Sequence, residues 1–408
     1  MKKYISEIVL KICSRCNINC SYCYMYNMGD TSYLNQPKFI DLKIVEELSK
    51  KIKKHCNDND IHNFSITLHG GEPLLYGKNK TSKLLDILKS IEDENLQVKI
   101  SIQTNGILID DEWCKIFKDY NLNIGISLDG PKETNDTNRV NFKGNGTYDE
   151  VVKGIEICKN NNIKFGILSV VNPNISPNLA YNHLKELDVK GVDFLILDEN
   201  YDNFNEFLPN VVSNWLISVF NLWFEERETI SIRIFENIIK GVYGLNFSAD
   251  SYGSSTNNAI IIETNGSIET LDVLKICGEK FTKNTLNILS NDLNEVFEND
   301  LINLYFFSNT LLSKKCLSCP VNEICAGGYI PHRYSSKNGF NNPSIYCDDL
   351  LNLIIHIQNK LIELMPIELI AESNLEKLNY NLAIEIINKN IVLVENPSYV
   401  DFLEKFKK

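Results

Sequence analysis

Six strand-like segments alternate with helix-like segments over residues 6 to about 227, and this order limits the possible folds more than any other feature of the sequence. The strand-like segments are short and mostly apolar, as expected for a sheet covered by helices. They are Ile8–Ile12, Asn63–Leu68, Val98–Thr104, Asn123–Leu128, Lys164–Val171 and Val192–Leu197. The helix-like segments are about Ile40–Asn57, Lys80–Glu92, Asp111–Asp119, Thr147–Asn161, Asn178–Leu187 and Val211–Arg227. Repeated strand–helix units predict an α/β fold with a parallel sheet, open or curled into a barrel.

The alternation stops after residue 240. Gly241–Asn258 is rich in Gly, Ser and Asn and predicts a linker. Two β-like runs, Ala259–Thr264 and Ser267–Leu271, flank Asn265-Gly266 and predict a hairpin with a tight primed turn. A loop-rich region follows, and Leu350–Leu364 reads as an amphipathic helix. We therefore predict domains at 1–240, 241–350 and 351–408, the last of them a helical tail.

Composition excludes several classes of function. The net charge of −12 disfavours a general grip on nucleic acid phosphates. No apolar run reaches the roughly 18 residues of a membrane span, and the N-terminus lacks the apolar core of a signal peptide. A cytoplasmic location, with neither nucleic acid nor membrane as partner, is the expectation.

Twelve cysteines need a chemical reason in a cytoplasmic chain, where disulfides are disfavoured. Four lie at 13, 16, 20 and 23, and four more at 316, 319, 325 and 347. Cys277 lies between these groups, and Cys56, Cys114 and Cys158 are isolated. Such clustering is typical of metal ligands.

Cys16, Cys20 and Cys23 have the spacing Cys-x3-Cys-x2-Cys on one short loop after the first strand. Three thiolates can hold three irons of a cubane cluster and leave the fourth iron open to a small chelating ligand. A zinc site with Cys13 as the fourth ligand is the alternative from the residues alone.

This spacing, with Tyr22 before the last cysteine, resembles the signature loop of the radical S-adenosylmethionine (SAM) superfamily. The resemblance implies that Cys16, Cys20 and Cys23 hold a 4Fe–4S cluster whose open iron binds the amino and carboxylate groups of SAM. It implies that Tyr22 lies near the adenine and that Cys13 is a packed thiol. It also implies a partial (β/α)6 TIM-like barrel.

Short polar groups follow the later strands. Gly70-Gly71-Glu72-Pro73 is similar to the family's GGEP motif, which meets the SAM ammonium group. Further positions that match SAM contacts in the family are Asn105, Ser127, Asp129 and Arg139. From the residues alone, these groups are equally typical of turns and caps. Asp198 and Glu199 follow the sixth strand and are either a base or peptide anchor, or solvated loop carboxylates.

The second cysteine group reads Cys316-x2-Cys319-x5-Cys325, followed by Cys347. A zinc site with four cysteines is the alternative here. The pattern resembles the SPASM domain (or the related twitch domain) of peptide-modifying enzymes, which implies an auxiliary 4Fe–4S cluster on these cysteines. A full SPASM domain has a second auxiliary cluster, but Tyr329 occupies one of its cysteine positions and Cys277 alone remains of an upstream pair. We therefore expect two 4Fe–4S clusters in all, one binding SAM and one auxiliary.

The stretch from Gly327 to Tyr346 resembles a branch of SPASM enzymes that forms carbon–carbon crosslinks (cyclophanes) in ribosomal peptides. His332 and Arg333 either contact the auxiliary cluster or the substrate, or Arg333 forms a structural salt bridge. The resemblance implies a precursor peptide substrate and an electron donor such as flavodoxin or ferredoxin. Because the first strand begins so close to Met1, we expect the peptide's leader to bind the barrel, the C-terminal half or a separate leader-recognition protein.

Other reactions fit the same motifs. They are thioether formation, peptide epimerisation and oxidation of Cys or Ser to formylglycine in a sulfatase. A zinc-stabilised scaffold protein without chemistry is the alternative from a different class.

Overall fold

The computed structural model describes residues 2–204, 210–226, 230–247, 249–253, 255–282, 285–366, 368 and 375–408. By its internal contacts the chain divides into two compact units. Unit 1 comprises Met1–Val170, Glu186–Leu195 and Asn258–Asn303, and unit 2 comprises Val171–Lys185, Ile196–Asn257 and Leu304–Lys408. The domain boundaries that we expect at 240 and 350 stay a prediction.

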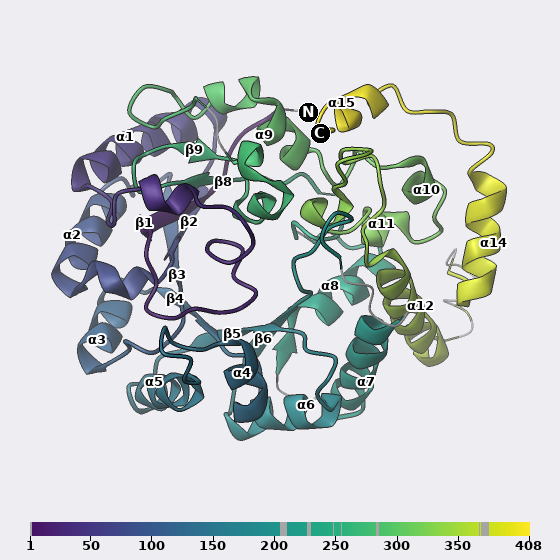
Figure 1. The fold of residues 1–408 in the computed structure, drawn as a ribbon, viewed down its shortest axis with the longest axis horizontal. Helices are drawn as coiled ribbons and strands as arrows, with labels where there is room; N and C mark the ends of the chain where they lie inside the picture. The colour runs from purple at the N-terminus through teal and green to yellow at the C-terminus, as the bar shows by residue number, and fades with distance from the viewer. Residues whose placement is uncertain are drawn as a thin grey trace. The chain divides into compact units, whose positions relative to one another are not determined.

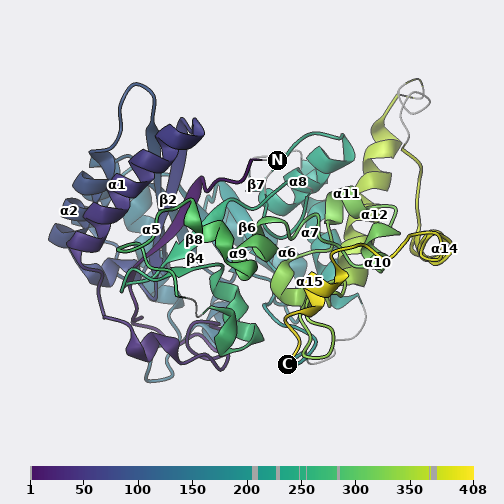
Figure 2. The ribbon, with the colours of Figure 1, turned by 90° about the horizontal axis from the view of Figure 1, so that it is seen from above.

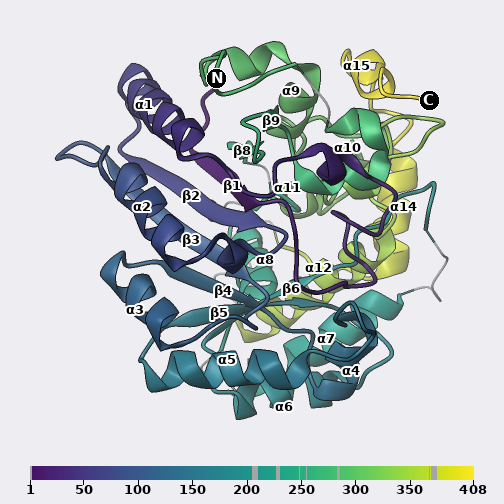
Figure 3. The same ribbon diagram turned by 60° about the vertical axis from the view of Figure 1, so that its left-hand side comes forward.

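Unit 1 is built on one sheet. Its strands are β1 (Glu7–Cys13), β2 (Asn63–Gly70), β3 (Gln97–Thr104), β4 (Asn123–Ser127), β5 (Phe165–Val170), β6 (Gly191–Leu195), β8 (Ala259–Ile262) and β9 (Ile268–Glu269). They lie in the order β6-β5-β4-β3-β2-β1-β8-β9, and every neighbouring pair is parallel except β8 and β9. Figure 3 shows β1 to β4 side by side in this order. The α/β fold with a parallel sheet is confirmed.

Helices cover this sheet, and most of them present an apolar stripe. The helices of unit 1 are α1 (Leu42–Asn59), α2 (Lys78–Lys89), α3 (Asp111–Asp119), α4 (Lys132–Asn138) and α5 (Tyr148–Asn160). In α1, the residues Val45, Leu48 and Ile52 are fully buried at the spacing of one helix face. The carboxylate of Asp41 caps α1, and that of Asp110 caps α3. Figure 1 shows α1, α2, α3 and α5 following one another along the outside of the strands.

Unit 2 is mainly helical. Its elements are α6 (Pro177–Glu186), which ends in a residue of unit 1, α7 (Val211–Glu226), β7 (Ser231–Ile232), α8 (Arg233–Val242), α10 (Lys314–Leu317), α11 (Asn322–Cys325), α12 (Cys347–Leu364), α14 (Tyr380–Asn390) and α15 (Val400–Glu404). Helix α9 (Asp300–Phe306) spans the boundary between the units. The long helix α12 packs on α7, α8, α11 and α14, and Figure 2 shows it beside α10 and α11.

Short 3-10 helices complete the structure. They are η1 (Ser32–Asn35), η2 (Pro73–Tyr76), η3 (Asp272–Cys277), η4 (Glu279–Phe281), η5 (Glu295–Glu298) and η6 (Ile330–Arg333). None of the described helices is long and apolar enough to span a bilayer.

All six predicted strands and the six predicted helices between and after them are present, with ends that differ by at most three residues. Residue 227 of the sixth helix, residues 248 and 254 of the predicted linker, and 367 and 369–374 of the tail lie outside the described residues. The expected closing helix is α12, which begins at Cys347. Helices α4 and α8 were not predicted.

The predicted primed turn of the hairpin is wrong. Strands β8 and β9 are antiparallel, as expected, but only Gly266 has a positive φ, of 83°, and Asn265 does not. The amide of Gly266 donates to Glu263 O at 2.8 Å, and the amide of Glu263 donates to Ser267 O at 2.9 Å. This is the three-residue loop in which a type I turn is followed by a left-handed glycine.

Candidate active site

The loop that carries Cys16, Cys20 and Cys23 begins directly after β1 and is tied down along its length. Within the loop, the amide of Cys23 donates to Cys20 O at 3.1 Å, and the Asn27 side chain donates to the same carbonyl at 2.7 Å. The amide of Asn19 donates to Val140 O at 2.7 Å, and the amide of Ser21 donates at 3.0 Å to the carbonyl of Asn138, the last residue of α4. The loop is therefore held in shape before any ligand binds.

The cysteine sulfurs of the described residues are not gathered closely enough to form a ready-made tetrahedral zinc site. Cys13 is fully buried, and its thiol donates to Arg15 O at 3.3 Å, so it is a packed thiol. Among the described residues, no three cysteine sulfurs lie within 4.8 Å of one another. Tetrahedral zinc with bonds of about 2.3 Å needs sulfurs only about 3.8 Å apart. Cysteines that each bind a different iron of a cubane stand farther apart.

The glycine pair after β2 brings two backbone segments together. A Cβ on Gly70 would overlap with Cys13 O, and one on Gly71 would overlap with Arg15 O and the Tyr26 hydroxyl. The amide of Gly71 donates to Cys13 O at 2.8 Å. The pair thus sets the start of the cysteine loop against the end of β2.

Glu72 is fully buried and bound by the protein itself. Its two oxygens accept hydrogen bonds from Leu74 N at 3.0 Å, Thr104 Oγ1 at 2.7 Å and Asn105 N at 2.7 Å. Burial raises the pKa of this carboxyl, although these bonds oppose the shift. Pro73 begins η2, which the Glu72 side chain caps.

Tyr22, Asp129 and Arg139 form one buried group. The Tyr22 hydroxyl donates to Asp129 Oδ2, and Arg139 Nη1 donates to the Tyr22 oxygen at 3.0 Å. Asp129 Oδ1 accepts from Val170 N at 3.0 Å. Burial raises the pKa of Asp129, and Arg139 opposes this. Within the described part of the chain, Arg139 Nε is buried and has no hydrogen-bond partner, so the group has a free donor for an anion such as the SAM carboxylate.

Asn105 and Ser127 lie at the ends of β3 and β4. The Asn105 amide donates to Asn17 Oδ1 at 2.7 Å and lies 3.8 Å from Cys16 Sγ. Ser127 Oγ accepts from Gln103 Nε2 at 2.9 Å. Asn105 thus supports the cysteine loop, whereas Ser127 belongs to the edge of the sheet.

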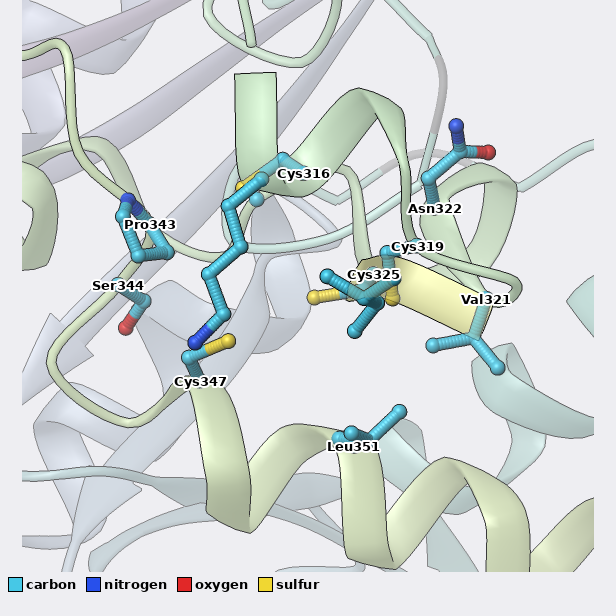
Figure 4. A pocket seen from close by; sticks show the side chains of 12 residues that line it. Cys316, Cys319, Val321, Asn322, Cys325, Pro343, Ser344, Cys347 and Leu351 are labelled. Atoms are coloured by element: carbon cyan, nitrogen blue, oxygen red, sulfur yellow. The ribbon is translucent and has the colours of Figure 1, made fainter. Parts of the chain in front are cut away.

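The second cysteine group lines a pocket in unit 2, of about 390 Å³ including its solvent-open part. Figure 4 shows the cysteine side chains around it, with Cys347 and Leu351 coming from the same helix, α12. The lining residues are Lys315, Cys316, Cys319, Val321, Asn322, Cys325, Gly327, Pro343, Ser344, Cys347, Leu351 and Ile387. Burial raises the pKa of Cys319 to about 11 and of Cys347 to about 12, so ligand binding must displace their protons.

Asp198 and Glu199 are held by the segment between Cys325 and Cys347. His332 Nε2 lies 3.2 Å from Asp198 Oδ1, and the His332 ring packs edge-on against Tyr329 and Tyr346. The Tyr346 hydroxyl donates to Leu197 O at 2.9 Å and lies 3.5 Å from Glu199 Oε2. Burial raises the pKa of Glu199. Glu199 is therefore buried and not a solvated loop group, whereas the Asp198 side chain, although held by His332, remains 24% exposed.

Arg333 forms no salt bridge within the described residues, so that alternative is wrong as well. It is buried, and its guanidinium donates to backbone carbonyls. Cys277, whose role the sequence left open, is buried at the end of η3 in unit 1, whereas the four-cysteine group is in unit 2.

Sequence reasoning missed a buried charge network in unit 1. Lys11 on β1 pairs with Asp272 and donates to His69 Nδ1 at 2.8 Å. Lys275 lies 3.0 Å from Glu269 and 3.6 Å from Glu263, so its ammonium fills the space between carboxylates that could otherwise hold a cation. The sequence feature that could have revealed this network is Lys11, a lysine within the apolar run of the first strand.

Comparisons with known proteins agree with this geometry. Residues 10–187 match the model of the radical SAM superfamily. The cysteine-type anaerobic sulfatase-maturating enzyme of Clostridium perfringens (strain 13 / Type A) is 27% identical over 354 residues, which cover 84% of this chain and 93% of that enzyme. The structure of native anSMEcpe with bound AdoMet and Cp18Cys peptide has a TM-score of 0.76 at 26% identity, covering 88% of this chain and 98% of that one. Streptococcus suis SuiB bound to precursor peptide SuiA has a TM-score of 0.58 at 18% identity, covering 81% and 73%, and supports the fold alone.

Fold, cysteine loop and family match together define the class: residues 10–187 form a radical SAM domain, whose cofactors are SAM and a 4Fe–4S cluster. The prediction of SAM and iron–sulfur cofactors is confirmed. Within this class, the chain is similar over most of its length to anaerobic sulfatase-maturating enzymes.

Proposed function

We propose that this radical SAM enzyme acts on a ribosomally made precursor peptide and joins two of its side chains by a carbon–carbon bond, forming a cyclophane. A peptide or protein substrate is supported by the similarity to enzymes that mature sulfatases and to a structure that holds a peptide. The observation that carries the crosslinking proposal is the segment from Tyr329 to Tyr346. It resembles the cyclophane branch and positions both Asp198 and Glu199.

In this proposal each cofactor has its own residues. Cys16, Cys20 and Cys23 hold the SAM-binding cluster, and Arg139 Nε donates to the SAM carboxylate. The auxiliary cluster is held by Cys316, Cys319, Cys325 and Cys347. When bound, SAM and its cluster supply a 5′-deoxyadenosyl radical, which removes a hydrogen atom from the peptide.

The rest of the work belongs to the chain. It must hold the reacting carbon against the aromatic ring and exclude water. Crosslinking removes two hydrogens from the peptide, one as an atom and the other as a proton and an electron. The Asp198–His332 pair accepts that proton, because the carboxylate lies 3.2 Å from Nε2 and orients the imidazole. Flavodoxin or ferredoxin supplies the first electron, and a separate protein or this chain binds the leader.

Formylglycine formation is the second candidate, and the similarity to sulfatase-maturating enzymes over 84% of the chain favours it. That reaction replaces a thiol or hydroxyl by an aldehyde and forms no ring. Thioether formation and epimerisation have no such specific observation.

The experiment measures 5′-deoxyadenosine release by anaerobically reconstituted protein, with Cys16→Ala as the control. Peptide products are then analysed by mass spectrometry, using a cysteine-containing sulfatase peptide and an aromatic-rich peptide library. A product that is two hydrogens lighter supports the cyclophane if its cysteines can still be alkylated and if no fragment ions arise from cleavage between the joined residues. An aldehyde on the sulfatase peptide would refute cyclophane formation and support formylglycine formation. Protein that contains zinc and no sulfide would exclude both reactions.

A further inference from the structure

The guanidinium of Arg333 is a buried cation without an anionic partner among the described residues. Its residue is 1% exposed. The acceptors of its hydrogen bonds, at 2.7 to 3.4 Å, are the backbone carbonyls of Ser308, Leu311, Ala326, Gly327 and Gly328. Carbonyl groups satisfy the N–H donors but leave the charge uncompensated, which is strongly unfavourable in a buried place.

The position of this cation points to the four-cysteine pocket. Three of the accepting carbonyls belong to residues 326–328, directly after Cys325. Gly327 has a φ of 76°, and a Cβ there would lie 3.0 Å from Arg333 Cζ, so the glycine leaves room for the guanidinium. Burial lowers the pKa of Arg333, and negative charge at Cys316 or Cys325 opposes this shift. The missing anion therefore belongs in the pocket.

We propose that Arg333 is the counter-charge of the auxiliary iron–sulfur cluster and that it raises the reduction potential of this cluster. The inference rests on the proposed function, which assigns the cluster to Cys316, Cys319, Cys325 and Cys347. A cluster on four thiolates is anionic and gains a further negative charge on reduction. A fixed cation in a medium of low dielectric constant stabilises the reduced state more than the oxidised state.

A raised potential gives this cluster a direction of electron flow. When the crosslinked radical loses a proton to recover its aromatic ring, one electron must leave with it. Arg333 makes the auxiliary cluster the better acceptor for that electron. The electrons balance in this step, because the substrate radical is oxidised by one electron and the auxiliary cluster is reduced by one.

The test is a redox titration, followed by electron paramagnetic resonance, of full-length protein carrying C16A, C20A and C23A, so that the auxiliary cluster alone gives a signal. In this background Arg333→Gln removes the charge and Arg333→Lys keeps it. Lys275→Met is the matched control, because Lys275 is an equally buried cation but has carboxylate partners in unit 1. At the midpoint of the unsubstituted background, we expect the ratio of oxidised to reduced cluster to rise at least about tenfold in R333Q, which is 59 mV for one electron.

R333K and K275M should stay within about twofold of the background, and R333Q with an unchanged potential would overturn the inference. If R333Q binds no iron, the result for R333K decides between a charge role and a purely structural role of Arg333. Iron with an unshifted potential in R333K supports the charge role. Loss of iron from R333K too would show that the hydrogen-bonding fork, and not the charge, holds the segment. Background protein with zinc or no iron in the pocket would refute the proposed auxiliary cluster itself, which is a separate failure.

Discussion

Arg139 shows how a single buried residue is prepared for a ligand. Tyr22, itself bound to Asp129, fixes one side of its guanidinium, while Nε has no hydrogen-bond partner among the described residues. Holding a charged group in place beforehand lowers the entropy that binding must remove.

Replacing Arg139 by Met should therefore weaken SAM binding. Charge-assisted hydrogen bonds contribute about 1.5 to 3 kcal/mol, so we expect the dissociation constant to rise at least about tenfold. Equilibrium binding of SAM to the reconstituted protein measures this. Lys132→Met, an exposed change on α4, should leave affinity unchanged, and equal affinity of both variants would refute the SAM contact.

Glu269 should make stability depend on pH. The buried charge network of unit 1 has three carboxylates, of Glu263, Glu269 and Asp272, but only two ammonium groups, of Lys11 and Lys275. Mainly because of burial, the pKa of Glu269 is raised from 4.5 to about 7. Between these values the folded chain holds a proton that the unfolded chain has lost. This stabilisation is complete below about pH 4.5 and disappears as pH rises through 7.

Urea unfolding at pH 5 and pH 7.5 measures the effect. The free energy of unfolding should fall between these values by an amount of order 1 to 3 kcal/mol more in the unsubstituted chain than in Glu269→Gln. Parallel profiles for the two proteins would show that Glu269 is ionised throughout.

At the scale of the element, the close approach of β2 to the cysteine loop depends on Gly71. In Gly71→Ala the new Cβ overlaps with Arg15 O and with the Tyr26 hydroxyl, so the loop must move. We expect a loss of about 1 to 3 kcal/mol of stability and a lower iron content after reconstitution. Gly166→Ala on β5 is the control, because its Cβ would meet only Gly191 O, at 3.5 Å. Equal iron in both variants would contradict this role.

The elements were predictable where one local pattern decided them. Helix α3 begins and ends as expected, because Asp110 caps it and Trp113 and Phe117 fall on one buried face. The hairpin turn was not predictable from Asn265-Gly266. The pairing of Ile262 with Ile268 sets the loop length, and that length selects the turn type.

For the whole molecule, the proposal of two clusters predicts how iron divides. Cys16→Ala should lower the iron and sulfide content by up to about half, and Cys347→Ala should do the same. Combining the two should leave little of either element. Iron, sulfide and zinc analysis after anaerobic reconstitution measures this. If Cys347→Ala keeps all of its iron, the auxiliary cluster lies elsewhere or does not exist.

How much of the candidate site could be predicted depends on how far apart its residues lie in the sequence. The cysteine spacing, GGEP motif and Asp198–Glu199 pair could be found from the sequence, because each lies within a few residues of chain. The link from Asp198 to His332 joins segments over a hundred residues apart, and the contacts of Arg333 with backbone carbonyls appear only once the chain is folded. A residue's type does not reveal which distant partner neutralises its charge.

The ion pair of Lys11 with Asp272 has a consequence for how this chain can evolve. Both side chains are buried, so loss of Asp272 removes the ion-pair partner of Lys11, and loss of Lys11 leaves Asp272 with only the more distant Lys275, at 3.9 Å. Single substitutions at either position should be purged, whereas a paired replacement by apolar residues can survive. The first strand and the start of η3 are thus inherited as one unit, and sequences descended from a common ancestor should change at 11 and 272 together.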